Sequence, residues 1–512
     1  MKKLIPIYAV LTALVMFVVQ SCNVSNEEEE SQYYNMVSSN TLVTGFSLAK
    51  NDSVMALLDS VRFTVDVNRR LIYNADSLPL GTKIDRLITR VSLASSTSTS
   101  EFEISGATNM KDTTFAYGGS ENTDSIDFTG DVYLTVKAAD GISSKRYKVV
   151  VNVHKMKSDS LYWNEMERTE LPGGVSNPVA QKTVQCGGAL FTLVQGASGY
   201  VVSTCENPEM FANWQKATVN FGFTPVISSL IATDDALYIL STEGALYKST
   251  DGGQQWSATG KTMYSLVSGY GNTLLGVEKK DGKYYYAYYP SAPAGADAGE
   301  VDKEFPVSGT SQSVIFANDW SQSKQALVLG GQMADGGLTG NVWGFDGKVW
   351  AKLSNVGVPA ARDITLVSYY YYMNRTGTLH YDKYPVWFAF GGKLADGSLS
   401  KKVYLSFDNG LHWSLGNDLV QLPESMDAFY GAQAYVYTSV LTTRMASGWE
   451  PVAVRQVPVW MRGSAAQTRV STPVNEWECP YIYVFGGYEA NGALSNTIWR
   501  GVVNRLSFKP II

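Results

Sequence analysis

The sequence is poor in the residues that metal centres and histidine-dependent active sites use. Its 512 residues include three histidines and four cysteines, which leaves little for a transition-metal site or a catalytic histidine. It also lacks a basic excess, because 41 Lys and Arg stand against 47 Asp and Glu, a formal net charge of −6. This charge excludes a basic surface for nucleic acid. We expect no cofactor, no metal ion and no nucleic-acid partner.

Glycine and aromatic residues, in contrast, are abundant. The chain has 46 Gly, 31 Tyr, 19 Phe and 12 Trp, a composition typical of many strands joined by tight turns. Hydrophobic residues make up 45% of the sequence, which supplies enough apolar material for folded cores. The length suggests two or three domains. The composition therefore predicts an all-β protein.

The N-terminus has the pattern of a secretory signal. Lys2 and Lys3 precede an uncharged apolar stretch that is short for a membrane span. Val19-Gln20-Ser21-Cys22 resembles a bacterial lipobox, in which cleavage before the cysteine exposes it for lipid attachment. We expect residues 1–21 to be a lipoprotein signal peptide and Cys22 to carry the lipid. A plain signal peptide and an uncleaved signal anchor are the alternatives.

An acidic run follows this cysteine. Glu27 to Glu30 resemble the export signal of lipoproteins that Bacteroidetes place on the outer face of the outer membrane. The alternative is a solvated acidic spacer. We expect residues 22–41 to form a polar tether and the protein to be an outer-membrane lipoprotein facing the cell exterior, with the periplasmic face as the alternative.

Alternating apolar residues predict a first β domain over residues 42–155. Val61 to Val67 alternate with polar residues, as on a half-buried strand. Val132 to Val136 and Tyr147 to Val153 alternate in the same way on either side of an Asp-Gly turn. This last hairpin resembles that of immunoglobulin-like or cadherin-like modules. The resemblance implies a β-sandwich that acts as a spacer.

Three later segments repeat one pattern. They are GGQMADGGLTGNVW from Gly330, GGKLADGSLSKKVY from Gly391 and GGYEANGALSNTIW from Gly486. Each follows an apolar run, so the double glycine ends a strand and Asp-Gly or Asn-Gly makes a turn. The pattern resembles the kelch repeat, which implies a β-propeller.

A second motif, S-x-D-x-G-x-x-W, occurs twice. It resembles the Asp-box, a turn between the outer two strands of a propeller blade, and its residues are Ser249, Asp251, Gly253, Trp256, Ser406, Asp408, Gly410 and Trp413. The Ser and Asp side chains are expected to cap backbone amides, so the motif holds a turn and does not catalyse.

The spacing of outer-strand tryptophans predicts six blades over residues 156–512. Trp214, Trp256, Trp350 and Trp413 mark four outer strands, and weaker strand ends lie near Phe305 and Leu506. The segment Leu161–Asn164 is one more expected outer strand. It either closes the ring against the last blade or belongs to a seventh.

Two interruptions, at residues 367–387 and 438–478, lengthen blades five and six between their first and second strands. Long aromatic loops on a rigid scaffold are common binding sites. The ligand-binding candidates are Tyr370, Tyr372, Arg375, His380, Tyr381 and Trp387. In the alternative interpretation, the tyrosine run is an inner strand with alternate rings buried.

Known propeller enzymes are a poor match. Sialidases need an arginine triad, and no arginine lies between Leu171 and Ala361. Kelch-type copper oxidases need two histidine ligands, whereas His154 lies outside the propeller and His412 lies in an S-x-D-x-G-x-x-W motif. We therefore assign no catalytic residue. Kelch-type mutarotases need only a few polar residues and stay possible.

Three cysteines remain beyond Cys22, namely Cys186, Cys205 and Cys479. Cys186 and Cys205 belong to one blade, where they either form a disulfide or are free thiols.

The chain as a whole resembles surface lipoproteins of Bacteroidetes that carry propellers. The preferred hypothesis is a non-catalytic module that binds a glycan or a surface protein. A carbohydrate-active propeller enzyme (mutarotase, lyase or hydrolase) and a structural subunit of an outer-membrane complex are the rivals.

Overall fold

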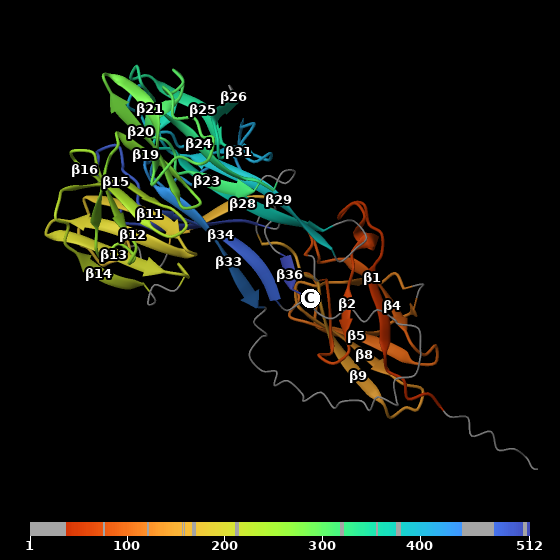
Figure 1. Cartoon of the computed structure of the whole chain (residues 1–512). Helices are drawn as coiled ribbons and strands as arrows, with labels where there is room; N and C mark the ends of the chain where they lie inside the picture. Colours follow the sequence, from red (N-terminus) through yellow and green to blue (C-terminus); the bar gives the residue numbers. More distant parts are fainter. Residues whose placement is uncertain are drawn as a thin grey trace, which may run out of the picture. The chain divides into compact units, whose positions relative to one another are not determined.

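A computed structural model describes residues 37–74, 77–119, 122–155, 157, 159–165, 170–209, 214–317, 322–354, 357–374, 380–442, 476–504 and 509–511. Figure 1 shows that the regular structure of these residues is strand, apart from one 3-10 turn, Leu58–Ser60. The expectation of an all-β protein is therefore confirmed. The predicted signal peptide, Cys22 and most of the tether lie outside the described residues.

The N-terminal part contains two antiparallel sheets. The first has the order β1 (Val43–Leu48), β4 (Leu87–Leu93), β7 (Ser125–Ile126). The second has the order β2 (Thr64–Asp66), β3 (Leu71–Tyr73), β9 (Ser144–Val150), β8 (Asp131–Lys137), β5 (Thr99–Ser105), β6 (Thr113–Ala116). The expected hairpin is β8–β9, with Val132 opposite Val149. Its immunoglobulin-like character stays a prediction.

One expected strand of this part is shorter than its sequence pattern indicated. The alternation from Val61 to Val67 yields only the three residues of β2, and the buried residue is Asp66, not a valine. The chain turns directly after β2, where Arg70 has a φ of 55°. The strand therefore ends before the last alternating residue, Val67, can join it.

Residues from 161 onward form six blade-like sheets, numbered here in chain order. Blades 1 to 3 consist of β11–β14 (Ala180–Cys186, Ala189–Gly196, Gly199–Cys205, Gln215–Val219), β15–β18 (Pro225–Ala232, Leu237–Ser241, Ala245–Ser249, Ser257–Thr262) and β19–β21 (Ser265–Tyr270, Thr273–Lys280, Lys283–Tyr289). Blade 4 consists of β22, β23, β24, β25 and β26 (Pro306–Ser308, Val314–Ala317, Lys324–Met333, Leu338–Phe345, Trp350–Ser354). In blade 3, the bridge between Tyr285 and Glu300 puts the segment before Phe305 at the outer edge.

The last two blades have the longest hairpins. Blade 5 consists of β28, β29, β31 and β32 (Thr365–Asn374, Tyr381–Phe390, Tyr404–Ser406, Ser414–Leu415), beside the small pair β27 and β30 (Ala361–Arg362, Lys393–Leu394). Blade 6 consists of β33, β34, β35, β36 and β10 (Gln433–Thr442, Glu476–Phe485, Ile498–Val503, Lys509–Ile511, Leu161–Glu165). The predicted interruption at 367–387 therefore extends the first two strands of blade 5. Most of the interruption at 438–478, residues 443–475, lies outside the described residues, and only its flanks belong to β33 and β34.

Strand β10 closes the ring. It pairs antiparallel with β35, Leu161 opposite Val503 and Trp163 opposite Gly501, and so becomes the outermost strand of blade 6. A Cβ atom on Gly501 would lie 2.6 Å from the Trp163 ring, so the close stacking of these two residues needs glycine. The segment Leu161–Asn164 thus completes the sixth blade and does not belong to a seventh. It also replaces the outer strand expected near Leu506, and residues 505–508 lie outside the described residues.

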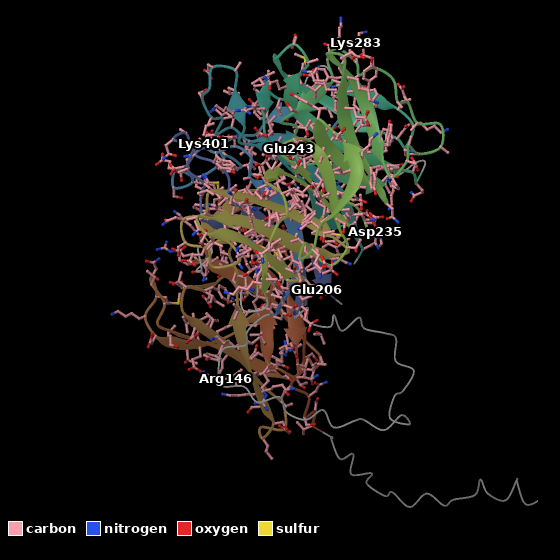
Figure 2. The ribbon with its side chains drawn as sticks, turned by 60° about the vertical axis from the view of Figure 1, so that its left-hand side comes forward. Arg146, Glu206, Asp235, Glu243, Lys283 and Lys401 are labelled. Atoms are coloured by element: carbon pink, nitrogen blue, oxygen red, sulfur yellow. The ribbon has the colours of Figure 1, made fainter. Side chains whose placement is uncertain are left out.

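Six apolar clusters fill the spaces between consecutive blades. Because successive side chains of a strand point to opposite faces, one strand feeds two clusters. In β29, Phe388 and Phe390 pack toward blade 6, and Trp387 and Ala389 pack toward blade 4. This explains why the middle strands are apolar at consecutive positions. Polar side chains such as Lys283 project from turns at the outside (Figure 2).

The three double glycines are contact points between blades. All six glycines have positive φ, from 62° to 118°. A Cβ on the first glycine would press on the following blade: 2.7 Å from Ala361 O at Gly330, 2.8 Å from Phe429 O at Gly391, and 2.5 Å from Gln181 Oε1 at Gly486. The repeated glycines are therefore required by close approach as well as by backbone conformation.

The two S-x-D-x-G-x-x-W segments form the same turn, between β17 and β18 and between β31 and β32. In the first, Asp251 Oδ1 accepts hydrogen bonds from Gln254 N and Gln255 N (3.1 and 3.0 Å). Gly253 N donates to Ser249 Oγ at 2.9 Å, and the indole of Trp256 donates to Gly253 O at 2.9 Å. In the second turn, Gly410 N donates to Ser406 Oγ, His412 N donates to Asp408 Oδ1 and the indole of Trp413 donates to Gly410 O, each at 2.9 Å.

We expect Asp251→Ala to destabilise the propeller by about 1 kcal/mol, because two backbone amides lose their acceptor in an exposed turn. Burial opposes ionisation, but hydrogen bonds from Gln255, Ser249 and Gln254 outweigh it and hold the pKa of Asp251 below its usual value. The stabilisation is thus present above the unfolded-state pKa, about 4, and is lost as the pH falls through the folded-state pKa. Urea unfolding at pH 7 and in acid measures both effects.

The exposed Asp427 is the control, since Asp427→Ala removes no hydrogen bond found in the described residues. Equal stability of Asp251→Ala and wild type at pH 7 would show that the turn does not depend on the carboxylate.

We expect Gly330→Ala to lose about 1 to 3 kcal/mol of folding free energy, because a Cβ there meets Ala361 O at 2.7 Å and the backbone φ is 67°. Gly336→Ala is the matched control. Gly336 also has positive φ, 88°, but the nearest atom to an added Cβ would be 4.0 Å away. The stability lost by Gly336→Ala therefore measures the cost of the backbone conformation alone. Thermal unfolding should show a larger loss for Gly330→Ala; equal losses would contradict the blade contact.

Candidate functional site

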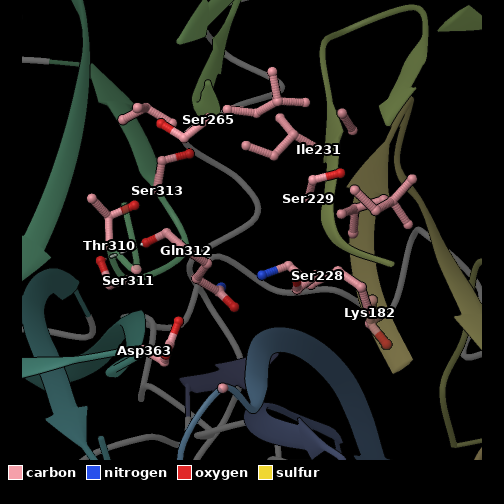
Figure 3. A pocket seen from close by; sticks show the side chains of 18 of the residues that line it. Lys182, Ser228, Ser229, Ile231, Ser265, Thr310, Ser311, Gln312, Ser313 and Asp363 are labelled. Carbon is pink, nitrogen blue, oxygen red and sulfur yellow. Dashed lines mark hydrogen bonds between the residues drawn. The ribbon is translucent and has the colours of Figure 1, made fainter. Parts of the chain in front are cut away.

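A channel of about 1030 Å³ lies at the centre of the propeller. It is lined by the inner strands β11, β15, β19, β28 and β33 and by the segment between β22 and β23, so every blade contributes. Figure 3 shows labelled side chains of β11, β15, β19 and the β22–β23 segment around the cavity. A concave space to which every blade contributes is a natural place for a ligand.

Hydroxyl and amide side chains dominate the channel wall. The polar residues that line it include Ser228, Ser229, Ser265, Ser308, Thr310, Ser311, Gln312 and Ser313 (Figure 3). Some of these hydroxyls connect neighbouring strands: Ser265 Oγ donates to Val307 O of β22 at 2.6 Å, and Ser229 Oγ accepts a hydrogen bond from Leu240 N of β16 at 2.9 Å. The wall is therefore polar and hydrogen-bonded.

Glutamine amides satisfy the backbone edges of the inner strands. Gln312 Nε2 donates to Ala434 O at 2.6 Å, and Ala434 N donates to Gln312 Oε1 at 3.0 Å. Gln433 Oε1 accepts from Thr183 N and from Gln181 Nε2, both at 2.9 Å. Buried backbone groups need such partners, so these side chains hold the strands that form the wall.

Charged side chains gather at one end of the channel, where blades 5, 6 and 1 meet. Arg362 and Lys393 are opposite one another in the β27–β30 pair, and the Arg362 guanidinium lies 3.7 Å from the Asp363 carboxylate. Lys182, on β11, also lines the cavity (Figure 3). Burial raises the pKa of Asp363, while the charges of Arg362, Lys182 and Lys393 oppose the rise. We call these four residues the charged mouth.

Lys182 is distinct from the other cations of the charged mouth. In the part of the chain that the structure describes, no hydrogen bond or ion pair holds its ammonium group, and the charge of Asp363 is its electrostatic partner. Burial lowers the pKa of Lys182, and the Asp363 carboxylate opposes this change. An amine in this setting gains from a ligand that brings a negative charge or hydrogen-bond acceptors.

Two tyrosines lie beside the charged mouth. Tyr430 and Tyr488 exchange backbone hydrogen bonds (3.1 and 2.8 Å), and their rings are 5.4 Å apart at an angle of 32°. Lys393 Nζ lies 5.4 Å from the Tyr430 ring. Gly431 N donates to Asp363 O at 2.8 Å, which fixes the tyrosine pair against blade 5. Both rings are half-buried and line the cavity, so each keeps an accessible surface.

The predicted ligand-binding tyrosines lie at the other end of β28. Tyr370 shares a hydrogen bond with Thr438, and Lys383 Nζ lies 3.7 Å from its ring centre. Tyr372 donates to Glu478 Oε2 at 3.1 Å. The structure therefore brings Tyr370 and Tyr372 together, half-buried, between the long hairpins of blades 5 and 6, but not at the charged mouth.

The other candidates are dispersed. Trp387 is 2% exposed and packs edge-on against Phe316, 5.1 Å away, so it is a core residue and cannot contact a ligand. His380 Nε2 lies 3.2 Å from Asp382 Oδ1, and Tyr381 begins β29. Arg375 lies outside the described residues.

The tyrosine run follows the alternative interpretation, because it lies on the inner strand β28 and alternate rings are buried. Tyr369 is 1% exposed and donates to Pro480 O at 2.9 Å, and Tyr371 packs on the same apolar cluster. Because strand neighbours point to opposite faces, Tyr370 and Tyr372 lie on the other side of β28.

The cysteines form no disulfide in the structure: Cys186, Cys205 and Cys479 are free. Across the residues described, no cluster of His, Cys, Asp and Glu side chains is arranged to hold a metal ion. Within the same residues, no helix has the length and hydropathy to cross a membrane.

The sequence patterns did not predict the residues of the charged mouth or the tyrosine pair beside it. Lys393 and Tyr488 each follow a double glycine directly, so the repeat did contain a signal for two of them. Asp363, Lys182 and Tyr430 belong to no motif. They come together only because blades 5, 6 and 1 are neighbours in the ring.

Comparison with solved structures finds other propellers at low similarity. The structure of YjhT shares 12% identity, with 68% of this chain and 99% of that chain covered and a TM-score of 0.39. The N-terminal domain of Nup159 shares 11% (68% and 98% covered, TM-score 0.30), and an α-L-arabinanase of Penicillium chrysogenum complexed with arabinobiose shares 10% (68% and 99%, TM-score 0.24). No curated protein matches the sequence.

Two family descriptions together span most of the sequence. The DUF6242 N-terminal domain, a domain of unknown function, matches residues 29–151, and the DUF6242 beta propeller domain matches residues 157–511. The second match covers the whole ring described above, from β10 to β36. The chain belongs to the DUF6242 family, and its C-terminal domain is the β-propeller of that family.

Proposed function

We propose that the propeller is a non-catalytic binding module and that its ligand is a glycan held at the charged mouth. The observation that carries the proposal is the pairing of two accessible tyrosine rings with a polar channel of about 1030 Å³. Sugar rings present apolar C–H faces and many hydroxyl groups, so they suit aromatic surfaces next to hydrogen-bonding side chains.

The rigidity of the wall supports a binding role. The inner strands are cross-linked by Gln312, Gln433 and Ser265, so groups at the mouth are held in place before a ligand arrives. A preformed site does not have to order its side chains on binding, which improves affinity. The half-buried Tyr370 and Tyr372 are a second place for contacts with the same extended ligand.

We further propose that the protein is an outer-membrane lipoprotein anchored through Cys22 and facing the cell exterior. The support is the charge-then-apolar N-terminus, the cysteine that ends it and the acidic run at Glu27 to Glu30. In this arrangement, the N-terminal domain and the tether act as spacers that present the propeller to polysaccharides outside the cell.

The experiment that tests the glycan proposal is an array screen with the full chain in detergent, followed by analysis of the same polysaccharides for released products. Saturable binding without products supports a binding module. Product release would show an enzyme instead, and binding to no glycan would contradict the proposal and favour a surface-protein partner.

For a glycan found in this screen, we expect Tyr488→Ala to weaken binding about fivefold, since loss of one aromatic contact costs about 1 kcal/mol. Isothermal titration calorimetry measures the change. Tyr162→Ala is the control, because Tyr162 is 49% exposed on the outermost strand of blade 6 and does not line the channel. If both variants bind like wild type, the tyrosine pair is not part of the glycan site.

We expect Cys22→Ala to abolish incorporation of a radiolabelled fatty acid and to release the protein from the membrane fraction, because acyl chains contribute about 0.8 kcal/mol of membrane affinity per buried CH₂ group. Cys205→Ala is the control for loss of a cysteine, since Cys205 is buried in blade 1. Unchanged labelling of Cys22→Ala would contradict the lipid anchor.

A further inference from the structure

The charged mouth carries more positive charge than its own carboxylate can balance. Arg362 and Lys182 line the cavity together with Asp363, and Lys393 lies opposite Arg362 in the β27–β30 pair, so three cations act on one carboxylate. The remaining charged residue of the cavity lining is Glu243, which is exposed at the β16–β17 turn of blade 2, where it accepts a hydrogen bond from Ser241 Oγ at 3.0 Å. The sector formed by blades 5, 6 and 1 therefore has an excess of positive charge.

We propose that the glycan bound at the charged mouth is anionic, and that its carboxylate or sulfate group pairs with Lys182, Arg362 and Lys393. This inference rests on the proposed function and adds the chemical class of the ligand. Both groups present oxygen acceptors with negative charge, which an ammonium and a guanidinium bind with strong, charge-assisted hydrogen bonds.

The positions of the aromatic rings agree with an acidic sugar. A Cβ built on Gly431 would lie 3.5 Å from the Tyr488 ring and 3.9 Å from Asp363 Cβ, so the Tyr488 ring and the base of the Asp363 side chain border the same small space. A sugar ring on Tyr488 would thus hold its substituents within reach of the charged residues. Asp363 would accept a hydrogen bond from a sugar hydroxyl, while the cations take the acidic group.

Lys182, on β11, favours an external partner. It has no direct ionic partner among the described residues, although burial makes its charge costly. A ligand with an anionic group supplies that partner.

Calorimetry with matched saccharides tests this inference on the full chain in detergent. The probes are oligogalacturonate and its methyl ester, which differ in the carboxylate charge, and chondroitin sulfate and its desulfated form, which differ in the sulfate. We expect at least one acidic member to bind tenfold or more tightly than its less charged partner, and added salt to reduce this difference.

Lys182→Met removes the charge and keeps the side-chain stem, so it should lower the preference for the acidic saccharide over its less charged partner at least fivefold. Lys182→Arg should retain most of this preference. Lys283→Met is the control, because Lys283 is exposed at the start of β21 in blade 3 and does not line the channel. Thermal unfolding shows whether each variant is folded. Should Lys182→Met unfold, Lys393→Met tests the same charge from β30.

The outcomes separate the two proposals. Equal affinity for acidic and less charged partners would overturn the anionic ligand and leave the glycan module standing. Binding to no saccharide would overturn both. Competition by inorganic sulfate at the same concentration as the sulfated glycan would also overturn the inference, because the site would then recognise a free anion and not a sugar.

Discussion

The pairing of β10 with β35 is the contact on which the propeller depends. It joins Leu161–Glu165 to Ile498–Val503, segments from opposite ends of the domain, and gives blade 6 its outermost strand. The ring depends on closure because each of its six apolar clusters lies between two blades, so displacing one blade exposes the apolar residues of the clusters on both of its sides. The closure also brings blade 6 against blade 1, and this junction holds one side of the charged mouth.

Two separate needs explain the polar character of the channel. The inner strands of the blades have free backbone edges, which would be costly without partners, and Gln312, Gln433 and Ser265 provide them. These residues are explained by the fold. Lys182, Arg362 and Asp363 are not, because none of them ties one strand to another through its side chain in the described residues. Charge placed in a channel without a structural task is the feature that points to a ligand.

The repeated glycine pairs connect the architecture with the site. Each first glycine lets a blade approach its successor closely, and the residues after two of the pairs, Lys393 and Tyr488, belong to the charged mouth and to the tyrosine pair beside it. The same motif therefore sets the blade spacing and delivers one residue to each of these groups. The S-x-D-x-G-x-x-W turns have a different role: their hydrogen bonds stay within each turn, and their tryptophans enter the clusters between blades.

Much of the fold could be predicted from the sequence, since local patterns report local structure. Strand-rich composition, double glycines, S-x-D-x-G-x-x-W turns and tryptophan spacing led to a six-bladed propeller, and the long hairpin of blade 5 lies at the expected position. The pattern at Val61 to Val67 misled because a turn ended the strand early. Trp387 misled because an aromatic residue in a long hairpin looks the same in sequence whether it faces a ligand or a neighbouring blade.

The sequence by itself determined the β class, the blade repeat and the turns, because each depends on residues close together in the chain. The tertiary structure alone decided that Leu161–Glu165 would close the ring, which tyrosines of the run would be buried, and that Lys182, Asp363, Lys393, Tyr430 and Tyr488 would meet. These residues are spread over three blades, and only Lys393 and Tyr488 share a motif, the double glycine that precedes each of them. Their proximity follows from ring closure, which places the first and last blades side by side.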